Sequence, residues 1–528
     1  MLTKQDIKQI SPLSWCNIFC IILLISGVLY SPFLYTIALM LMVFRILFIG
    51  KIKQKLDNIK TAKELLLILI LVYLLNIVGG LWANNCNQYL FELNHKLPFL
   101  IIPLFACVIM PINKKEIFFV FISYLILLTC GLIIGFVHYF IDPYASSRLL
   151  IPTARNIALS ENLCLAIAFM VISVYNDRKL VKYLLPLIVL FVGYMFLAEL
   201  LTGLVTLTVL FLYGIVYLLN HYKQKITIPV LITSIIIVFF AVFWFYKQYD
   251  NYFTPKEKLL TNSTAFTAEG NRYEKPMDDF IENGYYVNNY VCRKEMDSAW
   301  LNRTKIDIKA SYKSKGDTVS YPIAYAVQRY INSKGLRKDA EGVKALTDKD
   351  INNIKQGMAN VVYSERFSIR PRLYQTFFEF ERYFKTGEIN DMSIIQRYFW
   401  SKNAIHIIKQ NPIIGVGTGK APQELVAPVI KTHPELCTTF CNPHNAILYI
   451  LVSFGIFGLA VTLIYMLYPM INLRLCKNHY YSVFLIILIC WMFSESTFES
   501  YEGMTFISTL CSFFALYTHN KIEDNKVY

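Results

Sequence analysis

Residues 116–140 read EIFFVFISYLILLTCGLIIGFVHYF, and the stretch contains one acidic residue, Glu116 at the start, one histidine, His138 near the end, and no lysine or arginine. A helix needs about 20 largely apolar residues to cross the roughly 30 Å hydrocarbon core of a bilayer, so this stretch predicts a membrane span. Further apolar runs lie at residues 13–30, 33–49, 64–82, 97–110, 157–175, 181–197, 200–219, 226–246, 443–470, 480–496 and 503–519. Together they predict an all-α polytopic membrane protein with about 12 transmembrane helices.

The composition agrees with a membrane protein and argues against a soluble one. Hydrophobic residues make up 55% of the 528 residues and charged residues 16%, whereas about 25% are charged in a typical soluble domain. The formal net charge of +15 would on its own be compatible with nucleic-acid binding. Most of the excess lies in short loops on one side of the predicted bundle, however. We therefore interpret it as a topology signal and predict no nucleic-acid partner.

Basic residues mark alternate loops, as the positive-inside rule requires. When the N-terminus is placed in the cytoplasm, every loop on that side contains lysine or arginine. These residues are Lys51, Lys53, Lys55, Lys60, Lys63, Lys114, Lys115, Arg178, Lys179, Lys182, Lys223, Lys225, Arg474, Lys477, Lys521 and Lys526. The pattern predicts a multi-pass protein of the bacterial inner (cytoplasmic) membrane with both termini in the cytoplasm.

Three regions follow from this topology. Residues 1–247 form an N-terminal membrane region of about nine spans, and residues 443–528 a C-terminal membrane region of about three. Residues 248–442 between them are polar and too long for a simple connector, so we predict an extracytoplasmic (periplasmic) loop domain. Helical periodicity at 338–357 and 372–385 predicts that this domain is mainly helical.

The end of the long loop reads as an amphipathic helix at residues 392–410. Its Tyr398, Phe399 and Trp400 are residue types that favour the boundary between bilayer and water. The Asn-Pro pair that follows at 411–412 ends the helix, because a residue before proline avoids the helical conformation. We therefore expect this helix to lie at the membrane surface.

Asn442-Pro443-His444-Asn445, at the predicted outer end of the tenth span, is the strongest candidate for chemistry. The unperturbed pKa of histidine is near neutrality, so an imidazole here is able to take a proton from a sugar hydroxyl. The alternative is an interfacial histidine that caps the helix or bonds locally.

A glycine run, Gly415-Val416-Gly417-Thr418-Gly419, precedes this motif. A nucleotide cradle would need a strand before it and a helix after it, and nucleotides are scarce outside the cytoplasm. We interpret the run as a tight turn near the membrane surface whose backbone amides are able to bind the phosphates of a lipid carrier.

Charged residues gather on the same outer side. Glu495 and Glu499 connect the last two spans, and Arg148 and Arg155 follow the fifth. The guanidinium fork matches phosphate oxygens and suits a diphosphate held at the membrane surface. The alternatives are a solvated hairpin for the glutamates and lipid headgroup contact for the arginines.

The residues His433, Cys437, Cys441 and His444 have a spacing that superficially resembles a zinc site. The predicted compartment is oxidising, which makes a disulfide between Cys437 and Cys441 a better interpretation than a metal site. Two free thiols remain the third alternative.

Taken together, these motifs resemble the O-antigen ligase and polymerase family. The resemblance covers about residues 392–510 and depends on the order of several loose motifs. They are Arg397, Trp400, Ala404, Pro412-x-x-Gly415-Val416-Gly417-x-Gly419, His444-Asn445, the leucine-rich stretch with Gly455 and Gly458, and Glu495, Glu499 and Gly503.

The resemblance implies a GT-C-like glycosyltransferase fold that uses no metal and no cofactor. Such an enzyme moves a glycan from an undecaprenyl-diphosphate carrier in the membrane lipid onto an acceptor hydroxyl, with lipid A core the favoured acceptor. By this resemblance His444 is the general base or acceptor-orienting residue, and Arg155 and Arg397 bind the diphosphate, with Arg148 as an addition. Supporting residues are Asn445, Glu495, Glu499, Gly415 and Gly417.

The chain departs from the family at one place. Many members have a Ser-Arg pair before a glycine early in the span that matches 200–219, but this chain has Leu201-Thr202-Gly203 there. The candidates for the missing charge are Arg148, Arg366, Arg370 and Arg372.

Other functions remain open at this stage. Within the family, an O-antigen polymerase or a protein O-oligosaccharyltransferase uses the same donor with a different acceptor. A flippase for lipid-linked glycans, or another transporter, is the alternative from a different class. Transporters place ionisable residues near the bilayer midplane and have repeated halves. Here the polar residues gather at the outer ends of the spans, which favours the glycosyltransferase.

Overall fold

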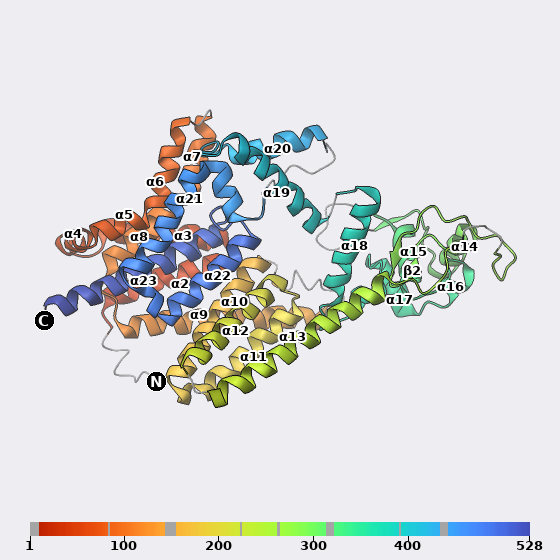
Figure 1. The fold of residues 1–528 in the computed structure, drawn as a ribbon, viewed down its shortest axis with the longest axis horizontal. Coiled ribbons are helices and arrows are strands. Elements are labelled where there is room, and N and C mark those ends of the chain that lie inside the picture. The colour runs from red at the N-terminus through yellow and green to blue at the C-terminus, as the bar shows by residue number, and fades with distance from the viewer. Residues whose placement is uncertain are drawn as a thin grey trace.

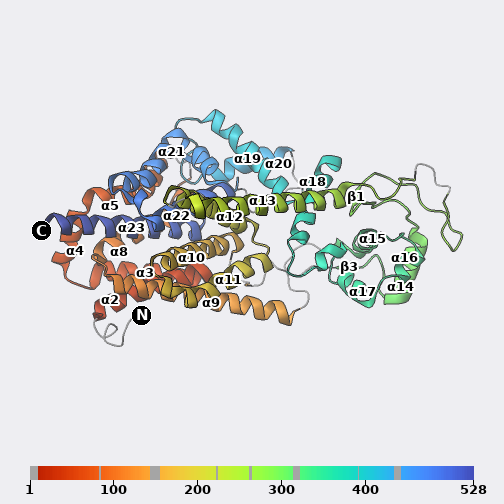
Figure 2. The same cartoon turned by 60° about the horizontal axis from the view of Figure 1, so that its bottom comes forward.

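The computed structural model describes residues 10–82, 85–142, 151, 155–221, 224–260, 265–312, 321–389, 392–432 and 442–527. It is 76% helical with almost no strand, which confirms the predicted all-α class. The molecule is elongated: a helical bundle with the two chain ends occupies one part, and a smaller domain formed by the long loop projects from it (Figures 1 and 2).

Every apolar run predicted from the sequence forms a helix. The bundle comprises α2 (Pro12–Tyr30), α3 (Pro32–Phe48), α4 (Ile52–Thr61), α5 (Lys63–Leu69), α6 (Leu71–Val78), α7 (Cys86–His95), α8 (Pro98–Ile109), α9 (Lys114–Ile141), α10 (Asn156–Asn176), α11 (Val181–Leu197), α12 (Leu201–His221), α13 (Gln224–Phe253), α21 (Ala446–Asn472), α22 (His479–Ser494) and α23 (Tyr501–Val527). Seven helices among the described residues are long and apolar enough to cross a membrane, or nine when each of two bent pairs counts as one span. The chain is therefore a polytopic helical membrane protein.

The predicted span at 64–82 is bent, and a helix that was predicted as part of a loop turns sharply away from the span at 33–49. The axes of α3 and α4 meet at 104°, and those of α5 and α6 at 57°. Helix α4 is amphipathic, and its apolar residues Ile52 and Leu56 are exposed on the surface. An amphipathic helix that turns across the end of a span has the geometry of a helix lying in the membrane surface.

Helices from the two ends of the sequence pack together in the bundle. Helix α23 packs along α8, and α22 packs against α10 and α12. Phe99, Tyr465 and Trp491 are among the residues of their common core. As a result, the loop between α22 and α23 meets the junction of α7 and α8, although the two are far apart in the sequence.

The loop domain begins where α13 leaves the bundle (Figure 2). It contains α14 (Arg293–Thr304), α15 (Ile323–Ser333), α16 (Ala340–Lys344), α17 (Asp348–Lys355) and α18 (Arg370–Thr386), with two short antiparallel pairs, β1 (Ile281–Glu282) with β2 (Tyr285–Tyr286) and β3 (Ser311–Tyr312) with β4 (Tyr321–Pro322). Its core includes the fully buried Trp300, Tyr330 and Ile354. The loop thus has an apolar core of its own.

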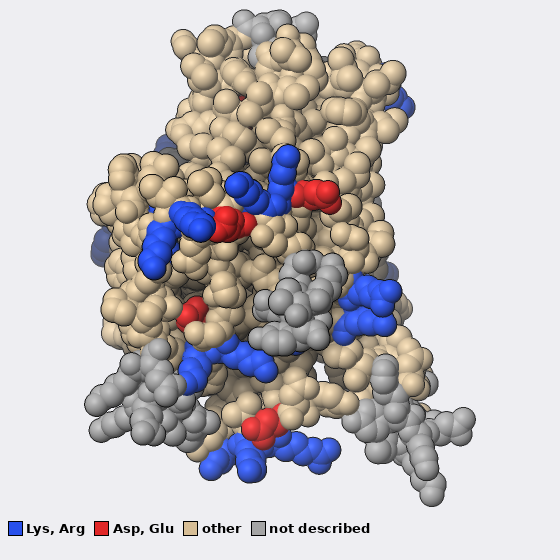
Figure 3. Space-filling model, turned by 90° about the vertical axis from the view of Figure 1, so that its left-hand side faces the viewer, with Lys and Arg blue, Asp and Glu red and all other residues tan. Residues whose placement is uncertain are grey.

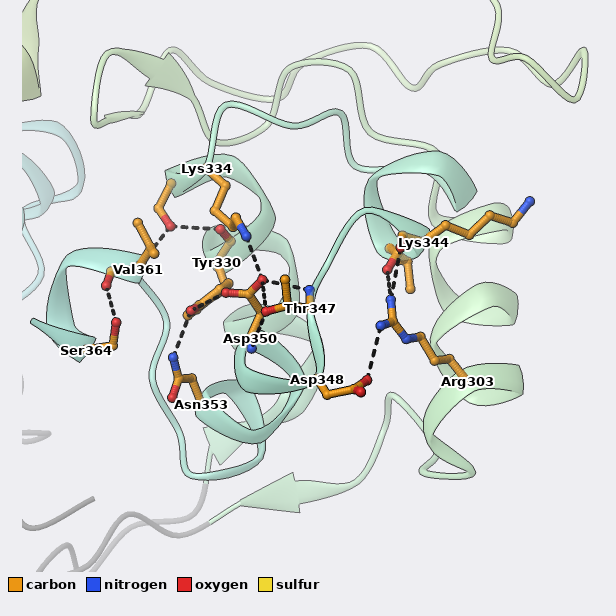
Figure 4. Close-up of polar contacts among 12 residues, drawn as sticks. Arg303, Tyr330, Lys334, Lys344, Thr347, Asp348, Asp350, Asn353, Val361 and Ser364 are labelled. Atoms are coloured by element: carbon orange, nitrogen blue, oxygen red, sulfur yellow. Dashed lines mark hydrogen bonds and ion pairs between the residues drawn. The ribbon is translucent and has the colours of Figure 1, made fainter. Parts of the chain in front are cut away.

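The buried carboxylate of Asp350 bonds to several segments of this small domain (Figure 4). Asp350 accepts hydrogen bonds from the Tyr330 hydroxyl at 2.9 Å and from the Thr347 backbone N–H at 2.8 Å, and it pairs with the Lys334 Nζ at 2.5 Å. The predicted helix at 338–357 is consequently two helices, because Thr347 caps α17 through Asp350. The helix predicted at 372–385 is confirmed as α18.

The chain returns to the bundle through α19 (Ser393–Gln410) and α20 (Ala421–Thr432). Helix α19 ends at Gln410 with Asn411 as its C-cap, as predicted. The expectation that Trp400 faces the bilayer interface is wrong. Trp400 is buried at 4% exposure among side chains of the loop that include Ile395 and Val429, whereas Tyr398 is 56% exposed. The large indole is drawn into this apolar cluster because α19 packs against α20 and α21.

Candidate active site

The glycine run fits into a break in α21. Gly455 has φ 60° and ψ −157°, which interrupts the helix. The backbone N–H of Val416 donates to the Val452 carbonyl at 2.9 Å, and that of Gly417 donates to the Ser453 carbonyl at 2.8 Å. These bonds fix the start of α21 relative to α19, which lies just before the run in the sequence.

Gly415 allows the two backbones to approach this closely. It has φ 63°, and a Cβ added to it would lie 2.4 Å from the backbone N of Phe454. The N–H groups of Gly415 and Thr418 also donate within the protein, to Asn411 and Gly79. The interpretation of these amides as phosphate ligands is therefore not supported, because consecutive N–H groups from 415 to 418 already have acceptors. Gly415 and Gly417 support the site by positioning α21.

The residues at the start of α21 leave the His444 ring available. Asn445 caps the helix by accepting a hydrogen bond from the Leu448 N–H at 3.0 Å. The backbone N–H of His444 donates to Asn442 Oδ1 at 3.0 Å, and His444 has a left-handed φ of 49°. Capping is therefore performed by the neighbour of His444, not by its imidazole.

The imidazole instead contacts the carboxylate of Glu495, in the loop between α22 and α23. The distance between His444 Nδ1 and Glu495 Oε1 is 2.9 Å. Arg397, on α19, places Nη2 4.0 Å from the other Glu495 oxygen and donates from Nη1 to the Ser494 carbonyl at 3.0 Å. Three segments thus bring a base, a carboxylate and a guanidinium together. Each of these side chains is between 22% and 36% exposed, so solvent and substrate are able to reach them.

The carboxylate sets the electrostatics of this group. Burial raises the pKa of Glu495, but the hydrogen bond and charge of His444, together with Arg397, outweigh burial and hold that pKa below its ordinary value. An ionised Glu495 accepts a hydrogen bond from a protonated Nδ1, and in this tautomer Nε2 of His444 has the free lone pair. The pair therefore has the arrangement of a histidine base oriented by a carboxylate.

A further cation, Arg155, pairs with a carboxylate in the first turn of α23. Glu502, whose side chain is only 1% exposed, pairs with Arg155 Nε at 3.1 Å, and the Arg155 guanidinium lies over the Tyr501 ring at 5.4 Å. The charges of Glu495 and Glu502 are close enough to interact. The Arg155 side chain is 62% exposed, so its guanidinium remains accessible to an anion.

Glu499 pairs with a residue that the sequence analysis missed. Lys96, between α7 and α8, is 4% exposed and places Nζ 2.5 Å from Glu499 Oε1 and 2.9 Å from the Phe498 carbonyl. Burial raises the pKa of Glu499 to about 7 despite the charge of Lys96. A lysine directly before the apolar run at 97–110 was the available signal, but nothing in the sequence indicates that it reaches position 499.

One trio near this pair has atoms close enough to share a metal ion, namely Glu92, His95 and Glu499. Lys96 lies 3.9 Å from Glu92 and 2.5 Å from Glu499. Its ammonium already supplies positive charge to both carboxylates, so a second cation there would be repelled. The trio therefore fits a metal poorly.

The other predicted residues are placed as follows. Arg148, Cys437 and Cys441 lie outside the described residues, so the disulfide stays a prediction. The three loop arginines proposed for the missing charge are engaged within or beside the loop domain. Arg366 lies over the Tyr139 ring, Arg370 pairs with Glu365, and Arg372 pairs with Glu379.

The described residues thus place a histidine–carboxylate pair and accessible arginines at one end of the bundle of a polytopic helical membrane protein. The comparison with known families agrees: residues 347–463 match the family model described as O-antigen ligase. This part of the chain is therefore similar to the O-antigen ligase and polymerase family, whose members are glycosyltransferase-like enzymes. The match includes Arg397, the glycine run and His444, and it ends before Glu495. No curated protein matches the chain.

Proposed function

We propose that this protein transfers a glycan from undecaprenyl diphosphate to an acceptor hydroxyl on the extracytoplasmic side of the inner membrane, with lipid A core as the favoured acceptor. The observation that carries the proposal is the 2.9 Å contact between His444 Nδ1 and Glu495, with Arg397 beside the same carboxylate. It leaves one imidazole nitrogen free to accept a proton next to an accessible guanidinium.

The proposed reaction is a displacement at the anomeric carbon of the donor. The acceptor oxygen forms a bond to that carbon while the bond from the carbon to the diphosphate oxygen breaks. His444 Nε2 takes the hydroxyl proton, and Glu495 stabilises the resulting imidazolium. The electron pair of the broken bond stays on the diphosphate, whose charge Arg397 and Arg155 neutralise. No step requires a metal or an oxidant.

Replacing His444 tests the proposal directly. The His444→Ala variant should transfer glycan about 10²–10⁴-fold more slowly in a membrane assay, because one positioned base contributes on that scale. His406→Ala is the matched control, since His406 is an exposed histidine on α19 that contacts Gln410. Normal transfer by the His444 variant, at an equal amount of inserted protein, would remove the imidazole from the mechanism.

The acceptor is tested by deleting the gene and analysing the surface polysaccharide. Full-length chains left on the lipid carrier would support a ligase, as proposed. Single capped repeat units would indicate a polymerase, and loss of glycoprotein signal alone would indicate transfer to protein. Unflipped donor on the cytoplasmic leaflet would instead indicate a transporter.

A further inference from the structure

A polar hollow, separate from the site around His444, lies at the opposite end of the bundle from the loop domain. It has a volume of about 240 Å³, and the polar side chains that line it are Lys60, Lys63, Glu64, Tyr468, Asn472 and His519. These residues come from α4, α5, α21 and α23, so the hollow lies between elements from both ends of the chain. None of them belongs to the site around His444.

The charge around this hollow favours an anion. Figure 3 shows lysine and arginine side chains gathered on the face where α4, α5 and the end of α23 lie, with fewer acidic ones. The side chains of Lys60 and Lys63 form no ion pair or hydrogen bond with any described residue. Glu64 is the one acidic residue in the lining. With two lysines and one carboxylate, the lining of the hollow has a net positive charge.

A buried polar atom in the lining also lacks a partner. His519 Nδ1 is buried and forms no hydrogen bond with the described residues. Buried polar groups in folded proteins nearly always have a hydrogen-bond partner, so an unsatisfied one calls for an explanation. This nitrogen has almost no accessible surface, however, so a ligand oxygen would reach it only if the lining moved, and the inference below depends on the two lysines.

The hollow lies beside a helix that has the geometry of one lying in the membrane surface. Helix α4, which ends at Thr61, turns by 104° from α3 and exposes Ile52 and Leu56, as a helix in the membrane surface does. Lys60 is in the last turn of this helix, and Lys63 is the first residue of α5. On the predicted topology this face is cytoplasmic, where anionic lipids attract basic residues.

We infer that this hollow binds the phosphate group of an anionic lipid headgroup through Lys60 and Lys63. The same chemistry would bind a free phosphate. The location beside a surface helix favours the lipid. This site is independent of glycan transfer, and it would anchor the bent α3–α4 and α5–α6 segments to the ends of α21 and α23.

The test is a binding titration of the full-length protein in non-ionic detergent, with the shift in thermal unfolding as the measure of binding. The probes are short-chain phosphatidylglycerol, short-chain phosphatidylcholine and inorganic phosphate. Phosphatidylglycerol should bind, and the Lys60→Gln/Lys63→Gln variant should weaken its binding about tenfold or more, from about 1 kcal/mol per basic residue. The matched control is Lys51→Gln/Lys53→Gln, which removes two exposed lysines of the same face outside the hollow and should change affinity by less than about twofold.

A third variant distinguishes a change in binding from damage to the fold. Glu64→Gln removes the acidic residue and should tighten phosphatidylglycerol binding about fivefold, a gain that damage to the fold cannot produce. Equal losses in the two double variants, or equal binding of phosphatidylcholine, would overturn the inference. Tighter binding of inorganic phosphate than of the lipid, with the same dependence on Lys60 and Lys63, would overturn the lipid assignment. The His444→Ala variant should bind phosphatidylglycerol normally, so this result is separate from that of the proposed function.

Discussion

His444 and Glu495 are the residues on which the proposed chemistry depends. They are 51 positions apart in the sequence, His444 just before α21 and Glu495 just after α22. Because one orients the other, their contributions to catalysis should not be independent. The structure explains how: the carboxylate fixes which ring nitrogen has the proton.

A double-mutant cycle tests this coupling. Glu495→Gln should slow glycan transfer by about 10-fold to 100-fold, less than His444→Ala, because an amide still bonds to the ring but does not stabilise an imidazolium. The double variant should be no slower than His444→Ala alone, as expected for residues that act as a unit. The measurement is the transfer rate in membranes that contain equal amounts of the four proteins. Losses that multiply would show that the two side chains act separately.

Asp350 offers a prediction about pH. Burial raises the pKa of this carboxyl, but the ion pair with Lys334 and the hydrogen bonds from Thr347 and Tyr330 outweigh it and lower that pKa to about 2. Because the folded-state pKa is depressed, the stabilisation is complete above the unfolded pKa near 3.9 and is lost as the pH falls toward 2. The shift corresponds to about 2 kcal/mol for a side chain that is 8% exposed.

The corresponding experiment is hydrogen exchange in the full-length protein. At pH 6 the Asp350→Asn variant should exchange the amides of α17 about 30-fold faster than the parent, which is the factor for about 2 kcal/mol. The ratio should shrink as the pH is lowered from 4 toward 2, after correction for intrinsic exchange. Asp348→Asn is the control, because Asp348 is exposed and contacts only Arg303, at 3.4 Å. A constant ratio across this pH range would contradict the assignment.

At the scale of elements, the glycine run and the broken helix α21 form one structural unit. The prediction of a tight turn at 415–419 is consistent with the three positive φ angles there, but the turn serves the backbone of α21 and not a phosphate. A sequence pattern indicates that glycine is required at a position. It does not indicate whether another chain segment or a ligand makes the close approach.

Gly415→Ala tests this unit. The added methyl would meet the Phe454 backbone at 2.4 Å, and the positive φ adds strain. We expect a loss of about 1–3 kcal/mol in unfolding free energy, measured by thermal or denaturant unfolding in detergent. Gly214→Ala, at a helical position with open space around it, should be neutral or slightly stabilising. Equal stability of the Gly415 variant and the parent would show that the run is not tightly held.

For the whole molecule, the sequence was informative about the elements and less so about their contacts. The apolar runs predicted where helices form. The bends at the end of α3 and within residues 63–82 were missed, because composition does not report the direction of a helix axis. His444 and Arg397 were identified by their motif. Their meeting at Glu495, and the burial of Lys96 against Glu499, depend on how distant spans pack, which one sequence does not specify.

Lys96 connects the N-terminal and C-terminal spans at this end of the bundle. Its 4% exposure and its 2.5 Å contact with Glu499 make it a buried ion pair. Removal of one partner from such a pair typically costs about 3–5 kcal/mol, because the other charge stays buried without compensation. Lys96→Met should therefore lower the thermal stability of the full-length protein sharply. It should also slow glycan transfer, because the loop that contains Glu499 also contains Glu495.

The double variant Lys96→Met/Glu499→Gln separates charge from packing. It removes both charges of this pair, so it should recover much of the stability lost in Lys96→Met, and transfer should recover with it if the loop regains its position. Unfolding midpoints and transfer rates of the parent and the three variants provide the comparison. If the double variant were as unstable as Lys96→Met, the lysine would act through its shape or its bond to the Phe498 carbonyl. The two ends of the chain would then be joined by packing and not by this ion pair.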